Sequence, residues 1–188
     1  YSSYDCNNVT DAHAIAVAKL MKDCGVSITT NYSDNAHGSS ASLVMMESAL
    51  QNYFYYSSDT KYYNRSSYTG DWMDLIYGEL RQGRPIVYGA QDSKTNSGHG
   101  FILHGYDAST GQVYVNWGWD GQMDGYYDIE LLNPQDYSYN KDQELLTVAP
   151  TESQPVVTTK YNLSITSTGS GSVTYNGNTI SNNTSTYS

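Results

Sequence analysis

The sequence predicts an α+β domain in which helices come first along the chain and an antiparallel sheet follows. Apolar residues recur at helical spacing in three segments before residue 83. From residue 85 onward, short apolar runs alternate with Gly-containing turns, which is typical of strands and hairpins. A run of helices followed by a run of strands is the pattern of α+β folds.

A change of composition divides the chain into two parts. Pro150 and Pro155 bracket a polar stretch, and the residues beyond it are mostly Thr, Ser, Gly and Asn. We therefore predict one domain over residues 1–149, a linker over residues 150–160, and the truncated start of an all-β module over residues 161–188.

Each predicted helix has a polar residue where it begins. These start signals are, in chain order, Thr10 or Asp11, Ser40 or Ser42, and Asp71. Gly25 is expected to end the first helix and Gly83 the third. The apolar face of the first helix consists of Ala14, Ile15, Ala18, Leu20 and Met21.

Four short apolar segments predict the strands of the sheet. They are residues 85–89, 101–103, 113–115 and 125–129. A Gly-containing turn at residues 107–111 joins the second and third of them into a hairpin. In the tail, residues 161–165 and 172–175 predict another hairpin, turned at residues 168–171.

Charge and hydropathy exclude two classes of partner. The chain has 9 Lys and Arg against 19 Asp and Glu, a formal net charge of −10. It therefore lacks the basic surface that binds nucleic acid or anionic lipid. No stretch approaches the roughly 18 consecutive apolar residues of a membrane helix. The high content of Tyr, Asn, Ser and Thr, with little Lys, favours a secreted or cell-surface protein of a bacterium.

No cofactor or metal site is predicted. The four histidines do not have the spacing of zinc ligands. Residues 120–125 read as a turn because they lack the EF-hand pattern of calcium ligands. Two cysteines, Cys6 and Cys24, make neither a disulfide framework nor a metal site.

The segment that carries chemistry runs from residue 97 to residue 119. His99 stands between Gly98 and Gly100 at the start of an apolar strand, where the glycines leave room for a ligand beside the imidazole. The predicted hairpin brings Asn116, Trp117 and Trp119 back near His99. A polar neighbour and sheltering indoles would orient a histidine for proton transfer and desolvate it.

Both the partner of the His99 ring and the role of His99 itself have two interpretations. A slip of one residue in the hairpin exchanges the faces of the sheet, so either Asn116 or Trp117 could face the ring of His99. The alternative for His99 itself is an ordinary structural histidine at a strand end. His13, His37 and His104 are predicted to be structural.

Several motifs resemble those of the streptopain family of papain-like bacterial cysteine peptidases. They are residues 98–102, 115–121 and 124–134, with further similarity at residues 18–26, 38–41 and 71–72. The resemblance implies a papain-like cysteine protease fold in which His99 is the catalytic histidine. It further implies that Asn116 and Trp117 form the catalytic segment beside the imidazole. The substrate-binding residues that it implies are Ser40, Gly98 and Trp119.

The nucleophile does not match. The resemblance implies a cysteine on a helix upstream of Tyr1, where the chain starts without Met and without signal-peptide features. Cys24 falls in the last turn of a predicted helix, where the dipole disfavours a thiolate, and is expected to be a small buried residue. Cys6 lies in a stretch with no helical pattern. We therefore expect the histidine-bearing half of a peptidase domain, inactive alone, whose partner is the missing N-terminal part.

The predicted function is a cysteine endopeptidase that acts on protein or peptide substrates by acyl transfer, with His99 as the general base. Another Cys-His hydrolase, such as a cell-wall amidase, is an alternative, as are a catalytically dead relative and a non-catalytic secreted binding module. For Ser40, capping of the second helix is an equally good interpretation as contact with substrate.

Overall fold

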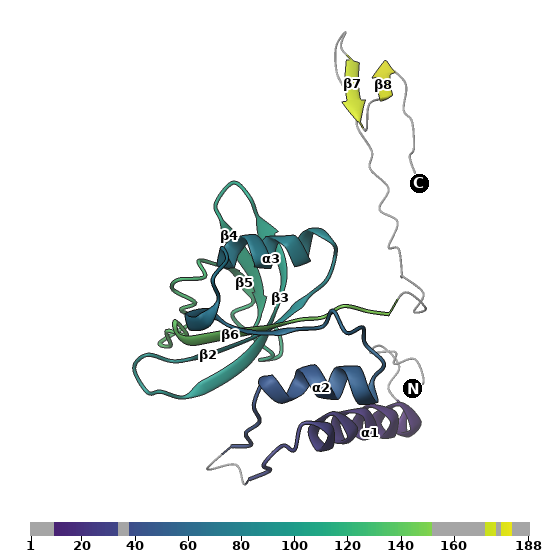
Figure 1. Ribbon diagram of the computed structural model, residues 1–188, viewed down its shortest axis with the longest axis vertical. Coiled ribbons are helices and arrows are strands. Elements are labelled where there is room, and N and C mark those ends of the chain that lie inside the picture. The colour runs from purple at the N-terminus through teal and green to yellow at the C-terminus, as the bar shows by residue number, and fades with distance from the viewer. Residues whose placement is uncertain (1–9, 34–37, 152–171, 176–177, 182–188) are drawn as a thin grey trace. The chain divides into compact units, whose positions relative to one another are not determined.

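The computed structural model describes residues 10–33, 38–151, 172–175 and 178–181 (Figure 1). The chain divides into two compact units, Tyr1–Glu152 and Ser153–Ser188. The described part of the second unit is an antiparallel hairpin of β7 (Ser172–Tyr175) and β8 (Asn178–Ser181). The first strand and the turn of the predicted tail hairpin, residues 161–165 and 168–171, lie outside the described residues.

The helices of the first unit begin largely where their capping residues indicate. They are α1 (Asp11–Ser27), α2 (Val44–Tyr53), the short 3-10 helix η1 (Arg65–Ser67) and α3 (Trp72–Arg81). The backbone N–H of His13 donates to the hydroxyl of Thr10 over 3.3 Å at the start of α1. The N–H of Asp74 donates to the carboxylate of Asp71 over 2.9 Å at the start of α3. Both caps confirm the predicted starts.

The predicted end of α1 at Gly25 is wrong by two residues. The helix continues to Ser27, and Gly25 is its buried residue. A Cβ atom at Gly25 would lie 1.7 Å from the hydroxyl oxygen of Tyr32. The glycine therefore makes room for the side chain of Tyr32 and does not end the helix.

The predicted start of α2 near Ser40 or Ser42 is also wrong. The helix begins at Val44, after Leu43, and no side chain caps it. The backbone of Ser40 instead forms a β-bridge with Asn31, with N–H to carbonyl distances of 2.8 and 3.0 Å. Because the chain around Ser40 is extended and paired, helix capping is excluded as the role of this residue.

Six strands of the first unit form one antiparallel sheet in the order β1-β6-β2-β3-β4-β5. Their bounds are β1 Tyr62–Asn64, β2 Ile86–Gln91, β3 Gly98–Asp107, β4 Gln112–Asn116, β5 Gly125–Tyr127 and β6 Lys141–Thr147. The predicted hairpin forms from β3 and β4. The fourth predicted strand, residues 125–129, is shorter than expected and ends at Tyr127. β1 and β6 were not predicted.

The two faces of this sheet differ in character. Along β2, β3 and β4, successive side chains point to opposite faces of the sheet. One of these faces carries the core. The core residues of these strands are Ile86, Tyr88, Phe101, Leu103, Val113 and Val115. Helix α3 covers this face, and the indole N–H of Trp72 donates to the hydroxyl of Tyr88 over 2.9 Å. The paired residues Gly89 and Gly100 lie on the opposite face, which therefore has no side chain at these two positions.

Helices α1 and α2 lie side by side and apart from α3 (Figure 1). The predicted apolar face of α1 is largely uncovered, because Ile15 is 69% exposed and Met21 67% exposed. Val26, near the end of the same helix, is 62% exposed. Among the described residues, no helix has the length and apolar character needed to cross a membrane.

Candidate active site

His99 is held in a fixed orientation by the backbone of the return strand. It is the second residue of β3, directly opposite Ala90 on β2. Its Nε2 atom lies 2.8 Å from the backbone carbonyl oxygen of Trp117. A carbonyl oxygen only accepts hydrogen bonds, so Nε2 carries a proton and donates it. In the neutral ring, Nδ1 is therefore the nitrogen available to take a proton from a reacting group.

Four aromatic rings surround the imidazole of His99. Their ring centroids lie 4.9 Å (Trp119), 5.5 Å (Tyr139), 5.9 Å (Phe101) and 6.3 Å (Trp117) from its own. Trp117 and Trp119 stack on it at interplanar angles of 17° and 28°. Burial, with the nearby Tyr137 and Asp92, raises the pKa of Tyr139 to about 12, so this phenol stays neutral. The rings shield the imidazole from water and restrict its rotation.

The turn after β4 fixes the carbonyl group that holds the ring. The N–H of Trp117 donates to Oδ1 of Asp124 over 2.9 Å. The N–H of Gly118 donates to Oδ1 of Asn116 over 2.8 Å, and Gly118 has φ +74°, which favours glycine. The side chain of Asn116 therefore shapes the turn, and the backbone of Trp117 is the hydrogen-bond partner of the ring. Asp124 was not singled out from the sequence.

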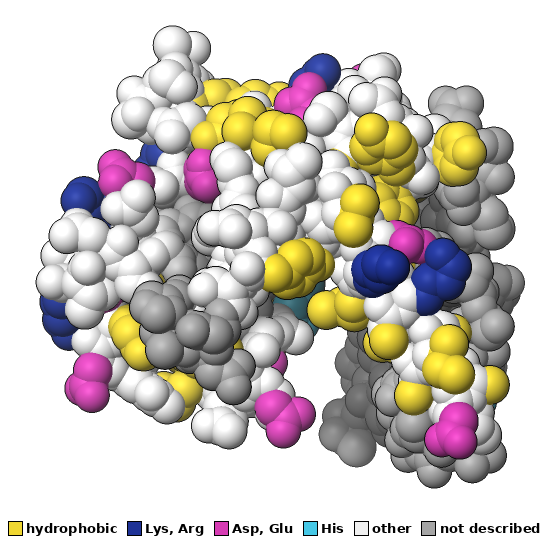
Figure 2. Space-filling model, turned by 90° about the horizontal axis from the view of Figure 1, so that it is seen from below, with side chains coloured by type: hydrophobic (Ala, Val, Ile, Leu, Met, Phe, Trp, Pro, Cys, Tyr) yellow, Lys and Arg dark blue, Asp and Glu magenta, His cyan; other side chains and the backbone are white. Residues whose placement is uncertain are grey.

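A pocket of about 1010 Å³ opens beside His99 on the glycine-bearing face of the sheet. Figure 2 shows this side of the molecule, deeply hollowed, with a histidine side chain at the inner end of the hollow. Two predicted substrate-binding residues, Ser40 and Gly98, line the pocket, as do Asn116 and Gly118. Trp117 and Trp119 are not among the lining residues. A concave, mostly preformed pocket with a few polar groups is the usual form of a binding site.

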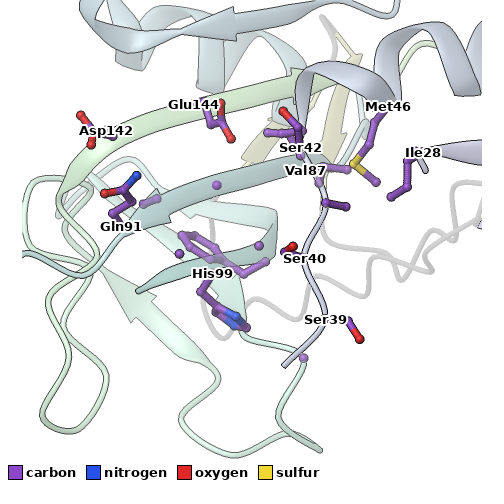
Figure 3. Close-up of a pocket in the computed structure, with 18 of the residues that line it drawn as sticks. Ile28, Ser39, Ser40, Ser42, Met46, Val87, Gln91, His99, Asp142 and Glu144 are labelled. Carbon is purple, nitrogen blue, oxygen red and sulfur yellow. The ribbon is translucent and has the colours of Figure 1, made fainter. Parts of the chain in front are cut away.

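The loop before α2 forms the wall opposite the sheet. Ser39 and Ser40 belong to it, and in Figure 3 Ser40 lies on the side of the pocket while Ser39 points away. Because the backbone N–H and carbonyl of Ser40 pair with Asn31, its hydroxyl is the group that remains for a ligand. Ser40 and His99 thus line the same pocket, and Figure 3 shows them near each other.

Cys24 is not activated as a nucleophile. It lies in the last turn of α1 and is exposed, which corrects the expectation that it is buried. Desolvation of its sulfur and the neighbouring carboxylate of Asp23 raise the pKa of the thiol. A raised thiol pKa reduces the thiolate fraction at neutral pH. Cys6 lies outside the described residues.

The other two histidines in the described part of the chain, His13 and His104, do not line this pocket. His104 lies at the irregularity between Leu103 and Gly105 on β3, is exposed, and has its ring centroid 4.9 Å from that of Tyr114. His13 lies in the first turn of α1, and His37 is outside the described residues. Within the described residues, no group of three or more His, Cys, Asp or Glu side chains could hold a metal ion.

Asp92 ties together the two loops next to His99. Its side chain is 1% exposed. Its carboxylate accepts from the N–H of Ser138 over 2.7 Å, and from the hydroxyl and N–H of Thr95 over 2.7 and 2.9 Å. Hydrogen bonds, chiefly from the Thr95 hydroxyl, lower the pKa of Asp92. The carboxylate therefore positions the segment that leads into His99 and the segment that carries Tyr139.

This arrangement predicts a pH-dependent contribution of Asp92 to stability. Because the pKa of Asp92 is lower in the folded state, the carboxylate stabilises the fold at pH values above its pKa in the unfolded chain, which is about 4. This stability is lost as the pH falls through the pKa of Asp92 in the folded state. We expect Asp92→Asn to lower the free energy of unfolding at pH 7. We also expect this free energy to fall less in the variant than in the wild type when the pH is lowered to 3. Urea unfolding at pH 7 and pH 3, followed by tryptophan fluorescence, measures both. The exposed Asp59→Asn is the control, and equal stability of Asp92→Asn and the wild type would contradict the role.

Comparison with known proteins gives the same family from sequence and from structure. Residues 2–127 match the peptidase C10 family. The thiol protease/hemagglutinin PrtT of Porphyromonas gingivalis is 33% identical over 139 residues, which are 70% of this chain and 15% of that protein. Streptopain of Streptococcus pyogenes is 31% identical over 140 residues, which are 70% of this chain and 34% of that protein. The chain thus spans about a third or less of these relatives.

A solved structure supports the fold. The active wild-type interpain A cysteine protease of Prevotella intermedia superposes with a TM-score of 0.70 at 39% sequence identity. The match covers 77% of this chain and 60% of the interpain A chain. A prointerpain A fragment matches with a TM-score of 0.63 at the same identity and covers 45% of that chain. The predicted α+β, papain-like cysteine protease fold is therefore confirmed.

Proposed function

Because this chain belongs to the peptidase C10 family, we propose that it supplies the general base and part of the substrate cleft of a cysteine peptidase. The observation that carries the proposal is the hydrogen bond of 2.8 Å between Nε2 of His99 and the carbonyl of Trp117. That bond fixes one nitrogen as a donor and leaves Nδ1 to exchange a proton with a thiol. This geometry supports His99 as the general base.

The thiol in this proposal comes from a part of the peptidase outside the described residues. Cys24 does not suit the role because it is exposed on α1 and has a raised pKa. The uncovered apolar face of α1, with Ile15 and Met21, supports a further segment that packs against this side of the domain. We infer that this segment carries the nucleophile and is the main partner of the chain.

The reaction that follows is acyl transfer in two steps. The thiol gives its proton to Nδ1 of His99, and the thiolate attacks the peptide carbonyl, so that a C–S bond forms and the C–N bond breaks. The protonated imidazole gives the proton to the leaving amine. A water molecule then loses a proton to the same nitrogen and hydrolyses the thioester, which releases the acid and restores the thiol. The carbonyl of Trp117 stabilises the positively charged ring between these transfers.

The substrate in this proposal is an extended peptide that lies in the pocket between Ser40 and Gly98. A cleft with glycine on its floor admits a peptide backbone close to the sheet. Trp119 stacks on the outer side of the imidazole and is exposed in part. We assign it to the wall that contacts the leaving part of the substrate.

The proposal that the histidine and the thiol lie on two different parts of the peptidase can be tested directly. We expect the isolated chain to leave casein intact, because its one described thiol, that of Cys24, is not activated. Addition of the cysteine-bearing segment should restore cleavage, and iodoacetamide should abolish it. Cleavage of casein by the isolated chain would contradict the proposal, as would full activity of the mixture after alkylation.

A further inference from the structure

One carboxylate lies on the pocket face of the sheet, two strands away from the strand of His99. Glu144 on β6 is directly opposite Gly89 on β2, and Gly89 is directly opposite Gly100 on β3. Directly opposed residues of antiparallel strands point to the same face. The side chain of Glu144 therefore lies on the glycine-bearing face, and the neighbouring positions on β2 and β3 carry no side chain.

The glycines leave the surface beside the carboxylate of Glu144 open, in the pocket that His99 also lines. A Cβ atom at Gly89 would lie 3.1 Å from both Cγ and Oε1 of Glu144, so the side chain lies close over β2. A Cβ atom at Gly98 would meet nothing within 4 Å, and one at Gly100 would meet only the Tyr88 carbonyl at 3.9 Å. The surface of the sheet at Gly98 and Gly100 is therefore open space that a ligand bound to Glu144 can fill.

Glu144 has a hydrogen-bond donor but no cationic partner among the described residues. The hydroxyl of Tyr62 donates to its Oε2 atom over 2.5 Å. Burial and this hydrogen bond raise the pKa of Tyr62, so the phenol remains a donor at neutral pH. The ion pairs of the described chain involve other carboxylates, and neither Lys nor Arg lines the pocket. A partly buried carboxylate without a cation favours a positively charged ligand.

The rest of the pocket suits a long side chain that ends in a charge. Figure 3 shows the carboxylates of Glu144 and Asp142 toward one end and the apolar side chains of Ile28, Met46 and Val87 toward the other. Lysine and arginine bury their methylene stems along apolar surface while the charged head reaches a polar group. The pocket offers both kinds of contact within one cavity.

We propose that Glu144 makes this pocket selective for peptides with an arginine or lysine side chain close before the cleaved bond. The inference rests on the proposed peptidase function and adds its substrate class. Arginine fits best because its planar guanidinium can donate two parallel hydrogen bonds to one carboxylate. Asp142, exposed on the same strand, adds negative charge at the rim and contributes less.

The test compares peptides in the complete peptidase. Fluorogenic peptides carry Arg, Leu or Glu in turn at each of the three positions before the cleaved bond. At one of these positions we expect kcat/KM for Arg to exceed that for Leu by about tenfold or more, as for a hydrogen-bonded charge pair. Glu144→Gln should lower this ratio at least about tenfold, and Asp142→Asn by less. Asp59→Asn makes the same change of charge outside the pocket and should leave the ratio unchanged.

Each outcome decides the inference. A preference for Leu at all three positions in the wild type would overturn it, as would an Arg preference that survives in Glu144→Gln. If no peptide is cleaved, the proposed peptidase function fails, and binding decides the role of Glu144. Isothermal titration of the same Arg and Leu peptides into the chain should then show tighter binding of the Arg peptide, lost in Glu144→Gln. Equal binding of the two peptides would reject the inference.

Discussion

Replacing His99 by alanine in the complete peptidase is expected to lower kcat/KM for peptide cleavage by about 10³-fold or more. In the proposed mechanism, the variant loses the group that both takes the proton of the thiol and protonates the leaving amine. Loss of one member of a nucleophile–base pair removes most of the benefit of the other, so the effect is large and not additive. Initial rates on a fluorogenic peptide at fixed enzyme concentration measure it.

His104→Ala is the matched control for this substitution. It removes the same ring from the same strand, where His104 is exposed and lies against Tyr114. We expect its kcat/KM to stay within about twofold of the wild type. A His99→Ala variant that keeps more than a tenth of the activity would show that another group transfers the protons.

Replacing Trp117 by alanine is expected to lower the free energy of unfolding by about 3–5 kcal/mol. The side chain is 0% exposed. Its ring centroid lies 4.5 Å from that of Phe101 and 5.2 Å from that of Tyr127. The substitution therefore leaves a large cavity in the core beneath the site. Urea unfolding followed by far-UV circular dichroism measures the change.

Tyr126→Ala is the control for the loss of an aromatic ring from this sheet. Tyr126 is 51% exposed and lies on β5 next to Tyr127, so a loss below about 1 kcal/mol is expected. Because Trp117→Ala keeps the backbone carbonyl that binds His99, the fraction of this variant that folds should retain part of the activity. A loss of stability below about 1 kcal/mol would show that Trp117 is not a core residue.

The elements with strong local signals could be predicted from the sequence. Caps at Thr10 and Asp71 mark the starts of α1 and α3, and the turn before Gln112 marks the hairpin of β3 and β4. The strand β6 gives no such signal, because it begins with four polar residues and its burial depends on the neighbouring β1 and β2. Its assignment therefore needs the tertiary structure.

The partner of His99 could not be derived from the sequence for two physical reasons. The pairing of β3 with β4 shifts register between Leu103 and Gly105, and a shift of one residue changes which side chains share a face. The hydrogen bond also goes to the backbone of Trp117, and every residue carries such a carbonyl. Motif similarity pointed to the segment that contains Trp117, whereas the atom that holds the ring is visible only in the structure.

The long-range contributions to the site were missed for a similar reason. Asp92, Asp124 and Tyr139 reach the surroundings of His99 through loops, and no local periodicity links them to it. The division of the chain at residues 149–161 and the secreted localisation stay predictions. The same holds for every site role assigned from the sequence, namely those of Ser40, Gly98, His99, Asn116, Trp117 and Trp119.

The pH dependence of thiol alkylation tests the central claim most directly, because it reports whether His99 shares a proton with the nucleophile. In the complete peptidase, we expect iodoacetamide to alkylate the catalytic thiol rapidly at pH 5.5, as for a thiolate paired with a cationic imidazole. In His99→Ala, the reaction should become fast only near pH 8.5, the range of an isolated thiol. The same alkylation profile in both proteins would contradict the account.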